Sequence, residues 1–285
     1  MTEQSPQPLV ETAHPLVRRV LAHNPSPFTH TGTQTHIVGR GEVAVIDPGP
    51  DIAEHVANIL KAVEGERIVA IVCTHTHRDH TPAARALAEA TGAPVMGCAP
   101  ILASDGSGLE AGFDHSYAPD RIMAEGDTVS APGWTLEAIF TPGHTSNHLC
   151  FALPEAQALF TGDHVMGWST SVVIPPDGDM GAYMASLEKL MPREDALFFP
   201  AHGDPVTRPR QLLRGMLGHR RQREGQILRT LEKGAASIPE MVAHMYAGLD
   251  PRLEKAAGLN VLAHLLDLDQ RGRVRAEGEM WSLAA

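Results

Sequence analysis

The pattern of apolar and polar positions predicts that strands dominate the first 200 residues. Residues 35–39 and 42–47 are two runs of strand-forming side chains, and the second ends in an Asp-Pro-Gly-Pro turn. Residues 67–73 form a continuous β-branched run, which is typical of a strand buried on both faces. Further strands are predicted over residues 134–140, 148–153, 158–161 and 197–199.

Helices are predicted between these strands. Residues 51–64 repeat apolar positions at intervals of three and four, which indicates an amphipathic helix. Thr81 and Pro82 start a second helix that continues through Ala90, with Gly92 just beyond its end. Residues 1–30 are interrupted by proline and histidine, so we expect an irregular entry segment there.

From Pro209 the pattern becomes almost purely helical. After Ser237 it indicates a helix, a turn, a second helix and a short strand pair, which is the outline of a winged-helix module. The sequence therefore predicts a strand-rich domain over residues 1–208 and a helical, winged-helix-like domain over residues 209–285.

Composition narrows the class of protein. The chain has 285 residues, of which 43% are hydrophobic and 20% charged, and this is ordinary globular usage. It contains no run of eighteen apolar residues and no secretory pattern near Met1, so we expect neither a membrane span nor export. Cys73, Cys98 and Cys150 lie far apart, which predicts no disulfide framework and favours a cytoplasmic location.

Histidine is the unusual component, with 16 copies. The chain from Thr74 reads Thr-His-Thr-His-Arg-Asp-His, which places His75, His77, Asp79 and His80 between a buried strand and the start of a helix. Packing does not explain so many polar side chains in one tight loop, because each would bury an unpaired polar group. Imidazole and carboxylate are ligands that zinc prefers and that iron and manganese also accept. The segment therefore predicts a metal site.

Three later segments offer further ligands. Each is an apolar strand followed by a turn residue and a ligand-type side chain, namely His144, Asp163 and His202. Gly162 precedes Asp163 and would let the backbone approach closely. Together the three segments are consistent with one sheet edge that converges on one site.

These residues, in this order, resemble the metallo-β-lactamase superfamily. The resemblance covers roughly residues 30–205 and implies an α/β fold, a four-layer αβ/βα sandwich with two metal ions at its strand edge. It implies that His75, His77 and His144 hold the first metal, that Asp79, His80 and His202 hold the second, and that Asp163 bridges them. It further implies that Asp47 orients a ligand imidazole.

The spacing and the tail look most similar to the beta-lactamase-like protein 2 branch, whose members are metal-dependent hydrolases. The resemblance implies hydrolysis without an organic cofactor, with two divalent ions, zinc being favoured, and a metal-bound hydroxide as nucleophile. Asp79 is the candidate to orient the nucleophile and accept its proton. The expected substrate is a small molecule with an ester, thioester, lactone or lactam carbonyl, and a glyoxalase II-like thioesterase is one alternative.

Cleavage of single-stranded RNA is another alternative, because residues 205–285 carry 13 basic and 9 acidic side chains while the whole chain has a net charge of −11. The charge is concentrated on one predicted helix, at Arg214, Arg220, Arg221 and Arg223. A third alternative, a metal-bearing DNA-binding regulator, is disfavoured by the complete ligand set.

Other residues have weaker predictions. His148 is a candidate to support the site from behind, whereas His164 is expected at the surface or in packing. Trp168 and Tyr183, in or near the segment 166–181, are candidates either for substrate contact or for simple packing. The tail is expected to narrow the active-site cleft and to pack on the body through Leu212, Leu213, Leu217 and Ile227. The sequence leaves the oligomeric state open.

Overall fold

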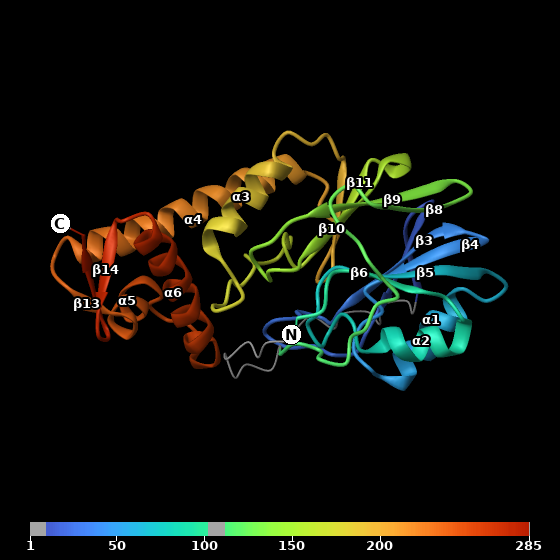
Figure 1. Cartoon of the computed structure of the whole chain (residues 1–285), viewed down its shortest axis with the longest axis horizontal. Helices are drawn as coiled ribbons and strands as arrows, with labels where there is room; N and C mark the ends of the chain where they lie inside the picture. The colour runs from blue at the N-terminus through green and yellow to red at the C-terminus, as the bar shows by residue number, and fades with distance from the viewer. Residues whose placement is uncertain (1–9, 102–111, 285) are drawn as a thin grey trace.

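Two β-sheets packed face to face, with helices on both outer sides, form the larger part of the molecule, and a smaller helical domain follows at one end (Figure 1). The computed structural model describes residues 10–101 and 112–284. The predicted four-layer αβ/βα sandwich is confirmed, and so is the winged-helix outline of the C-terminal part.

The first sheet has seven strands in sequential order. They are β1 (Val10–His14), β2 (Val17–Leu21), β3 (Gln34–Arg40), β4 (Glu42–Ile46), β5 (Arg67–Cys73), β6 (Val95–Gly97) and β7 (Arg121–Ile122). Neighbours are antiparallel from β1 to β4 and parallel from β4 to β7. The prediction of an irregular segment over residues 1–30 was wrong for β1 and β2, which form a hairpin around Pro15 and extend this sheet.

The second sheet has five strands in the order β12-β11-β10-β9-β8. They are β8 (Thr128–Ala131), β9 (Trp134–Phe140), β10 (Leu149–Leu153), β11 (Ala158–Gly162) and β12 (Leu197–Pro200). Only β11 and β12 are parallel within this sheet. The side chains of β9 alternate between buried and less buried positions, and β10 and β11 are buried throughout.

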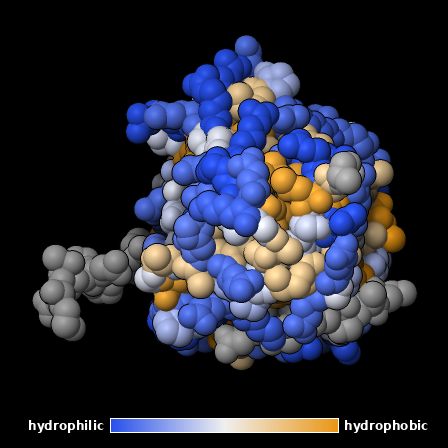
Figure 2. Space-filling view, turned by 90° about the vertical axis from the view of Figure 1, so that its left-hand side faces the viewer, coloured by the Kyte–Doolittle hydropathy of each residue, from blue (hydrophilic) through white to orange (hydrophobic). Residues whose placement is uncertain are grey.

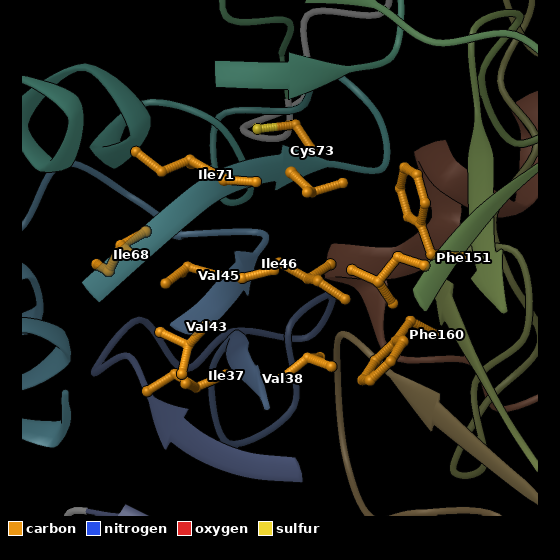
Figure 3. Packing of buried hydrophobic residues seen from close by; sticks show 14 of the residues in the cluster. Ile37, Val38, Val43, Val45, Ile46, Ile68, Ile71, Cys73, Phe151 and Phe160 are labelled. Carbon is orange, nitrogen blue, oxygen red and sulfur yellow. The ribbon is translucent and has the colours of Figure 1, made fainter. Parts of the chain in front are cut away.

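The main core lies between the two sheets. Val38 and Ile46 of the first sheet point toward Phe151 and Phe160 of the second, while Ile37 points to the opposite side of its sheet (Figure 3). This follows from the two-residue period of a strand, because Ile37 and Val38 are neighbours in β3. Burial of each large apolar side chain stabilises the fold by roughly 1.5–3 kcal/mol.

Four helices cover the outer faces. They are α1 (Ala53–Ala62) and α2 (Ala83–Thr91) on the first sheet, and α3 (Met180–Leu190) and α4 (Pro209–Leu231) on the second (Figure 1). The predicted helices over 51–64 and 82–90 correspond to α1 and α2. Helix α2 ends as expected at Gly92, whose φ of 71° is a left-handed conformation that suits glycine.

The C-terminal domain combines two helices with a small sheet. Its elements are β13 (Ala236–Ser237), α5 (Ile238–Met245), α6 (Glu254–Gln270), β14 (Val274–Glu277) and β15 (Met280–Leu283). Ser237 and Glu240 form a capping box at the start of α5. Met241, Leu265 and Trp281 pack in a core of the domain's own.

Helix α4 connects the two cores. Leu213 and Leu217 are buried against the second sheet and α3, and Leu212 packs beside them as expected. Ile227, predicted to pack on the body, lies instead in the core of the C-terminal domain. A boundary at 208/209 stays a prediction, since the first half of α4 packs with the preceding domain and its second half with the following one.

The molecular surface at the C-terminal end is mainly hydrophilic, with a smaller apolar area (Figure 2). Among the described residues, no helix combines the length and the apolar character that a membrane crossing requires.

Candidate metal centre

One edge of the sandwich carries all the predicted ligands. His75 and His77 follow β5, Asp163 follows β11 and His202 follows β12. His144 lies in the loop between β9 and β10, and Asp79 and His80 lie just before α2. Strands that end at a common edge deliver the residues that follow them to one place, so segments distant in sequence converge there.

The structure brings all seven predicted side chains together in two overlapping groups. The first contains His75, His77, His144 and Asp163, and the second contains Asp79, His80, Asp163 and His202. Within each group the ligand atoms lie within 4.8 Å of one another, and Asp163 belongs to both.

Distances in the first group are short. His75 Nε2 lies 3.0 Å from His77 Nδ1, and His144 Nε2 lies 3.2 Å from the same atom. His144 Nε2 is also 3.7 Å from Asp163 Oδ2. Phe113 stacks on the ring of His77, with centroids 5.1 Å apart, and thereby fixes the plane of that imidazole.

In the second group, carboxylates face imidazoles. His202 Nε2 lies 3.1 Å from Asp79 Oδ2 and 3.3 Å from Asp163 Oδ1. His80 Nε2 lies 3.4 Å from Asp79 Oδ2 and 3.6 Å from Asp163 Oδ2. Asp163 is therefore within reach of both groups, as a bridging carboxylate must be.

The two groups differ in their protonation. Burial lowers the pKa of His75 well below its usual value and that of His77 to about 3, so both imidazoles are neutral at pH 7. Burial would also lower the pKa of His202, but the carboxylates of Asp163 and Asp79 raise it to about 10. His80 behaves like His202, because Asp79 and Asp163 outweigh the effect of burial and raise its pKa.

Hydrogen bonds on the outer side fix the ring orientations. The Nδ1–H groups of His144 and His202 donate to the carbonyl oxygens of Val172 and Gly32, at 2.6 and 3.1 Å. His80 Nδ1 lies 3.0 Å from Asp47 Oδ2, as the resemblance implied for Asp47. With Nδ1 protonated and held outward, Nε2 of each ring faces the centre, where it can serve as a metal ligand once a bound cation displaces the second proton of His80 and His202.

Thr74 completes this outer layer. Its backbone N–H and its hydroxyl donate to the two carboxylate oxygens of Asp47, each at 2.8 Å. Since its hydroxyl proton is used in this way, Thr74 Oγ1 accepts from His75 Nδ1 at 3.0 Å. Sequence reasoning missed Thr74, Gly32 and Val172. The last two act through backbone carbonyl groups, which carry no sequence signal.

The donor set fits metal ions by an observation of its own. Within the described part of the chain, the buried atoms His80 Nε2 and His202 Nε2 face the carboxylates of Asp79 and Asp163 at 3.1–3.6 Å, and these contacts lack hydrogen-bond geometry. Buried polar atoms normally form well-aligned hydrogen bonds, so imidazole and carboxylate atoms that converge without them indicate a place for a cation. The adjacent lone pairs of His75, His77 and His144 also need a cation between them.

His148 and Gly162 hold the Asp163 loop from behind. His148 Nε2 accepts the backbone N–H of Asp163 at 3.3 Å, which agrees with the predicted supporting role. Gly162 has φ +48°, and a Cβ there would lie 2.7 Å from both His148 Nε2 and Thr74 Oγ1. The close approach expected at this glycine is therefore present.

The weaker predictions have mixed outcomes. His164 is fully buried and packs against the Tyr183 ring, with centroids 4.9 Å apart, in agreement with a packing role. For Tyr183 the packing alternative holds and the substrate contact does not, because the side chain is also fully buried and its hydroxyl donates to His164 O. Trp168 is 37% exposed and lines a pocket.

Three of the four arginines considered for RNA binding are engaged within the protein. Arg220 is 3% exposed and donates to the Ser171 carbonyl oxygen and to Asn260. Arg221 pairs with Glu188 at 2.9 Å. Arg223 donates to Met245 O and lies over the Tyr246 ring. Arg214 is exposed, so the four do not form one free basic surface.

Comparison with known proteins agrees with this geometry. Residues 30–202 match the family described as "Metallo-beta-lactamase superfamily", and residues 237–281 match the "Beta-lactamase associated winged helix domain". The "Lactamase-like protein adaB" of Aspergillus niger is 32% identical, over 95% of this chain and 86% of its own. The "Atrochrysone carboxyl ACP thioesterase dmxR1" of Cryptosporiopsis sp. is 32% identical, over 83% of this chain and 74% of its own.

Solved structures share the fold. A beta-lactamase domain protein from Burkholderia ambifaria superposes with a TM-score of 0.80, at 19% identity, and covers 96% of this chain and 93% of its own. A metallo-beta-lactamase family protein from Thermus thermophilus gives a TM-score of 0.78 at 18% identity, over 95% of this chain and 100% of its own. The chain thus belongs to the metallo-β-lactamase superfamily, as a hydrolase with an associated C-terminal winged-helix domain.

Proposed function

We propose that this enzyme is a thioesterase with two metal ions, which hydrolyses an acyl thioester of small-molecule size. The convergence of seven ligand-type side chains in two overlapping groups is the observation that carries the metal-dependent chemistry. The thioester is favoured over the other carbonyl substrates because relatives about one-third identical are named as acyl carrier protein thioesterases.

In this proposal His75, His77 and His144 hold one ion, Asp79, His80 and His202 hold the other, and Asp163 bridges them. Imidazole with carboxylate suits zinc, which is the metal we propose. When bound, such ions lower the pKa of water toward neutrality and polarise a carbonyl oxygen.

Asp79 is the residue that we assign to proton transfer. Its side chain is 17% exposed, against 11% for Asp163, so it is the carboxylate of the site that a substrate reaches more easily. Burial would raise the pKa of Asp79, but His80 and His202 lower it well below its usual value. The carboxylate is therefore ionised at neutral pH, and it can orient an attacking water and accept its proton.

The other side chains keep the site in place. Asp47 and Thr74 fix the rings of His80 and His75, and His148 fixes the backbone of Asp163. Such outer partners maintain the geometry that positions a substrate carbonyl relative to the attacking water.

A substrate panel tests this proposal. The metal-loaded protein is assayed with an acyl thioester, the matching oxygen ester, a lactone, a β-lactam and a single-stranded RNA. We expect kcat/KM for the thioester to exceed each of the others by at least about 10-fold, a difference of about 1.4 kcal/mol in transition-state binding. Absent thioester turnover, or preferred cleavage of RNA, would refute it.

A further inference from the structure

Among the described residues, a pocket between the two domains is lined by three basic side chains and by no acidic one. It has a volume of about 340 Å³, and its basic residues are His219, Arg220 and Arg223 of α4. One of its walls is the loop that follows Asp163, and the others are the chain around Phe28 and the region from Tyr246 to Asn260.

Arg220 is the least expected of these groups. Only 3% of its surface is exposed. Among the described residues its guanidinium contacts only neutral partners, which are Ser171 O, Asn260 Oδ1 and the ring of Tyr183. Its Nε has no hydrogen-bond partner in the described structure. An isolated buried charge is costly unless an opposite charge compensates it.

Arg223 and His219, which line the same pocket, also have nitrogen atoms without a hydrogen-bond partner in the described structure. Arg223 has an unpartnered Nε, and its Nη1 donates to neutral oxygens of Gln226 and Met245. His219 also has an unpartnered ring nitrogen, Nδ1. Burial, and then the charges of Arg220 and Arg223, lower the pKa of His219, as expected for an electropositive pocket.

Some arginines of the C-terminal part have acidic partners. Arg221, beside Arg220 in the sequence, pairs with Glu188, and Arg271 pairs with both Glu224 and Asp267. Others without an ion pair, such as Arg214 and Arg229, are exposed to solvent. No described carboxylate lies within ion-pair distance of Arg220 or Arg223, and Arg220 is buried, which sets it apart from these exposed arginines.

Most of the remaining lining is apolar and partly aromatic, and Ser169, Thr170 and Asn260 are its polar members. It includes Phe28, Met166, Trp168, Tyr246, Leu249 and Leu253. A pocket with apolar walls and a few convergent charged groups is typical of a site for an amphipathic small molecule. Arg223 lies 4.2 Å from the centroid of the Tyr246 ring, so charge and aromatic surface are adjacent.

The pocket is also connected to the metal centre. Arg220 donates to Ser171 O, and Ser171 Oγ donates to the carbonyl oxygen of Asp163. Val172, which lines the pocket, accepts the Nδ1–H of His144. A ligand in this pocket would thus contact the loop from Asp163 to Val172, which carries both the proposed bridging carboxylate and the carbonyl group that orients the His144 ring.

We propose that the interdomain pocket binds an apolar, aromatic or acyl group that carries an anion, and that this anion provides the opposite charge that Arg220 and Arg223 lack. This inference rests on the proposed function, because the group bound in the pocket is taken to be part of the thioester substrate. The anion is either a carboxylate of the acyl part or a phosphate of the carrier arm, since both are recognised by guanidinium donors.

Calorimetric titration with two probes tests the pocket without turnover. The holoenzyme is titrated with 2-naphthoate and with uncharged 2-naphthamide. We expect 2-naphthoate to bind at least about 10-fold more tightly, as one charge-assisted contact allows. Equal binding of the two probes, or no binding of 2-naphthoate, would overturn the proposal.

Arg223→Gln and Arg221→Gln are the matched variants. Arg223→Gln should reduce the preference for the anion to within about threefold, whereas Arg221→Gln should leave it unchanged, because Arg221 already pairs with Glu188. If Arg223→Gln retains the full preference, the naphthoate binds elsewhere, for example at the metal centre, and the proposal is wrong. Arg220→Gln is a second variant, used where circular dichroism shows that it folds.

Kinetics then separate the two sources of the anion. Thioesters of an aromatic acid with and without a ring carboxylate form one pair, and pantetheine and 4′-phosphopantetheine thioesters form the other. Within each pair, the two thioesters are compared by kcat/KM in the wild type and in Arg223→Gln. If the difference disappears in the first pair the anion is the acyl carboxylate, and if it disappears in the second pair the anion is the phosphate of the carrier arm. A difference that persists in both pairs contradicts the proposal. Anion-selective binding without thioester hydrolysis would instead support the pocket and refute the proposed function.

Discussion

Two of the places where the molecule buries ionisable side chains are the metal edge of the sandwich and the contact between the domains. At the metal edge, the imidazoles of His80 and His202 face the carboxylates of Asp79 and Asp163. Between the domains, Arg220 meets only neutral oxygens and an aromatic ring among the described residues. The first arrangement directs imidazole nitrogens and carboxylates at one point, and the second places a guanidinium away from every described carboxylate. The comparison teaches that unpaired buried groups indicate what each site is built to bind.

Removal of the bridging carboxylate should have the largest effect. Asp163→Ala removes a side chain that belongs to both ligand groups, so we expect turnover to fall at least about 1,000-fold and bound metal to fall below one equivalent. Steady-state kinetics and elemental analysis measure the two quantities, and circular dichroism should show an unchanged fold. Two equivalents of metal with a near-normal rate would show that Asp163 does not bridge.

Two glycine substitutions sharpen the contrast between the regions. In Gly162→Ala the new Cβ meets His148 and Thr74 at 2.7 Å, on a backbone with φ +48°, so we expect the free energy of unfolding to fall by about 2–3 kcal/mol. In Gly218→Ala, within α4, a Cβ meets nothing within 4 Å. Helix propensity should then stabilise the protein by about 0.5–1 kcal/mol. Denaturant unfolding measures both changes in the free energy of unfolding. If the two substitutions changed it equally, the difference in packing between the Asp163 loop and this part of α4 would be contradicted.

Loss of an outer partner should weaken the metal site without dismantling it. Asp47→Ala leaves His80 Nδ1 without its carboxylate acceptor. We expect metal affinity to fall about 10–100-fold, the range typical of such partners, while the ligands themselves remain. Competition with a chelator of known affinity gives this value. An unchanged affinity would mean that Asp47 has no part in orienting the ring.

A decrease in pH should lower the free energy of unfolding through His264, which is buried near the charge of Arg220. Burial, and then the charge of Arg220, lower the pKa of His264 to about 3, whereas the unfolded chain has the usual value of 6.5. As the pH decreases below 6.5, His264 therefore binds a proton in the unfolded state but not in the folded state. The free energy of unfolding falls as a result. Relative to pH 7.5, the loss from this group at pH 5 is about 2 kcal/mol. Unfolding of His264→Leu should show a correspondingly shallower pH dependence, and a parallel one would refute the assignment.

Most of the metal edge could be predicted from the sequence, because its ligands follow strands with strong apolar patterns. Strands β5 and β9 have the predicted bounds, and every predicted ligand reaches the edge. The hairpin of β1 and β2 was missed, since its short strands include buried Arg19 and flank a proline.

The contact between the domains was beyond local patterns. The burial of Arg220 depends on how α4 meets Ser171 and Asn260, which lie 49 and 40 residues away in sequence. The role of Tyr183 was left open for the same reason, because its neighbours His164 and Arg220 come from distant segments. Periodicity shows that a helix has a buried face, but it does not show which charged residue is enclosed when two domains pack.

The central claim is that this site acts through two metal ions held by the seven side chains. The most direct measurement is the metal content of the purified protein together with its thioester hydrolysis before and after chelation. The account predicts close to two equivalents per chain, loss of hydrolysis when EDTA removes them, and recovery when zinc is returned. Full hydrolysis by a metal-free protein in EDTA would contradict it.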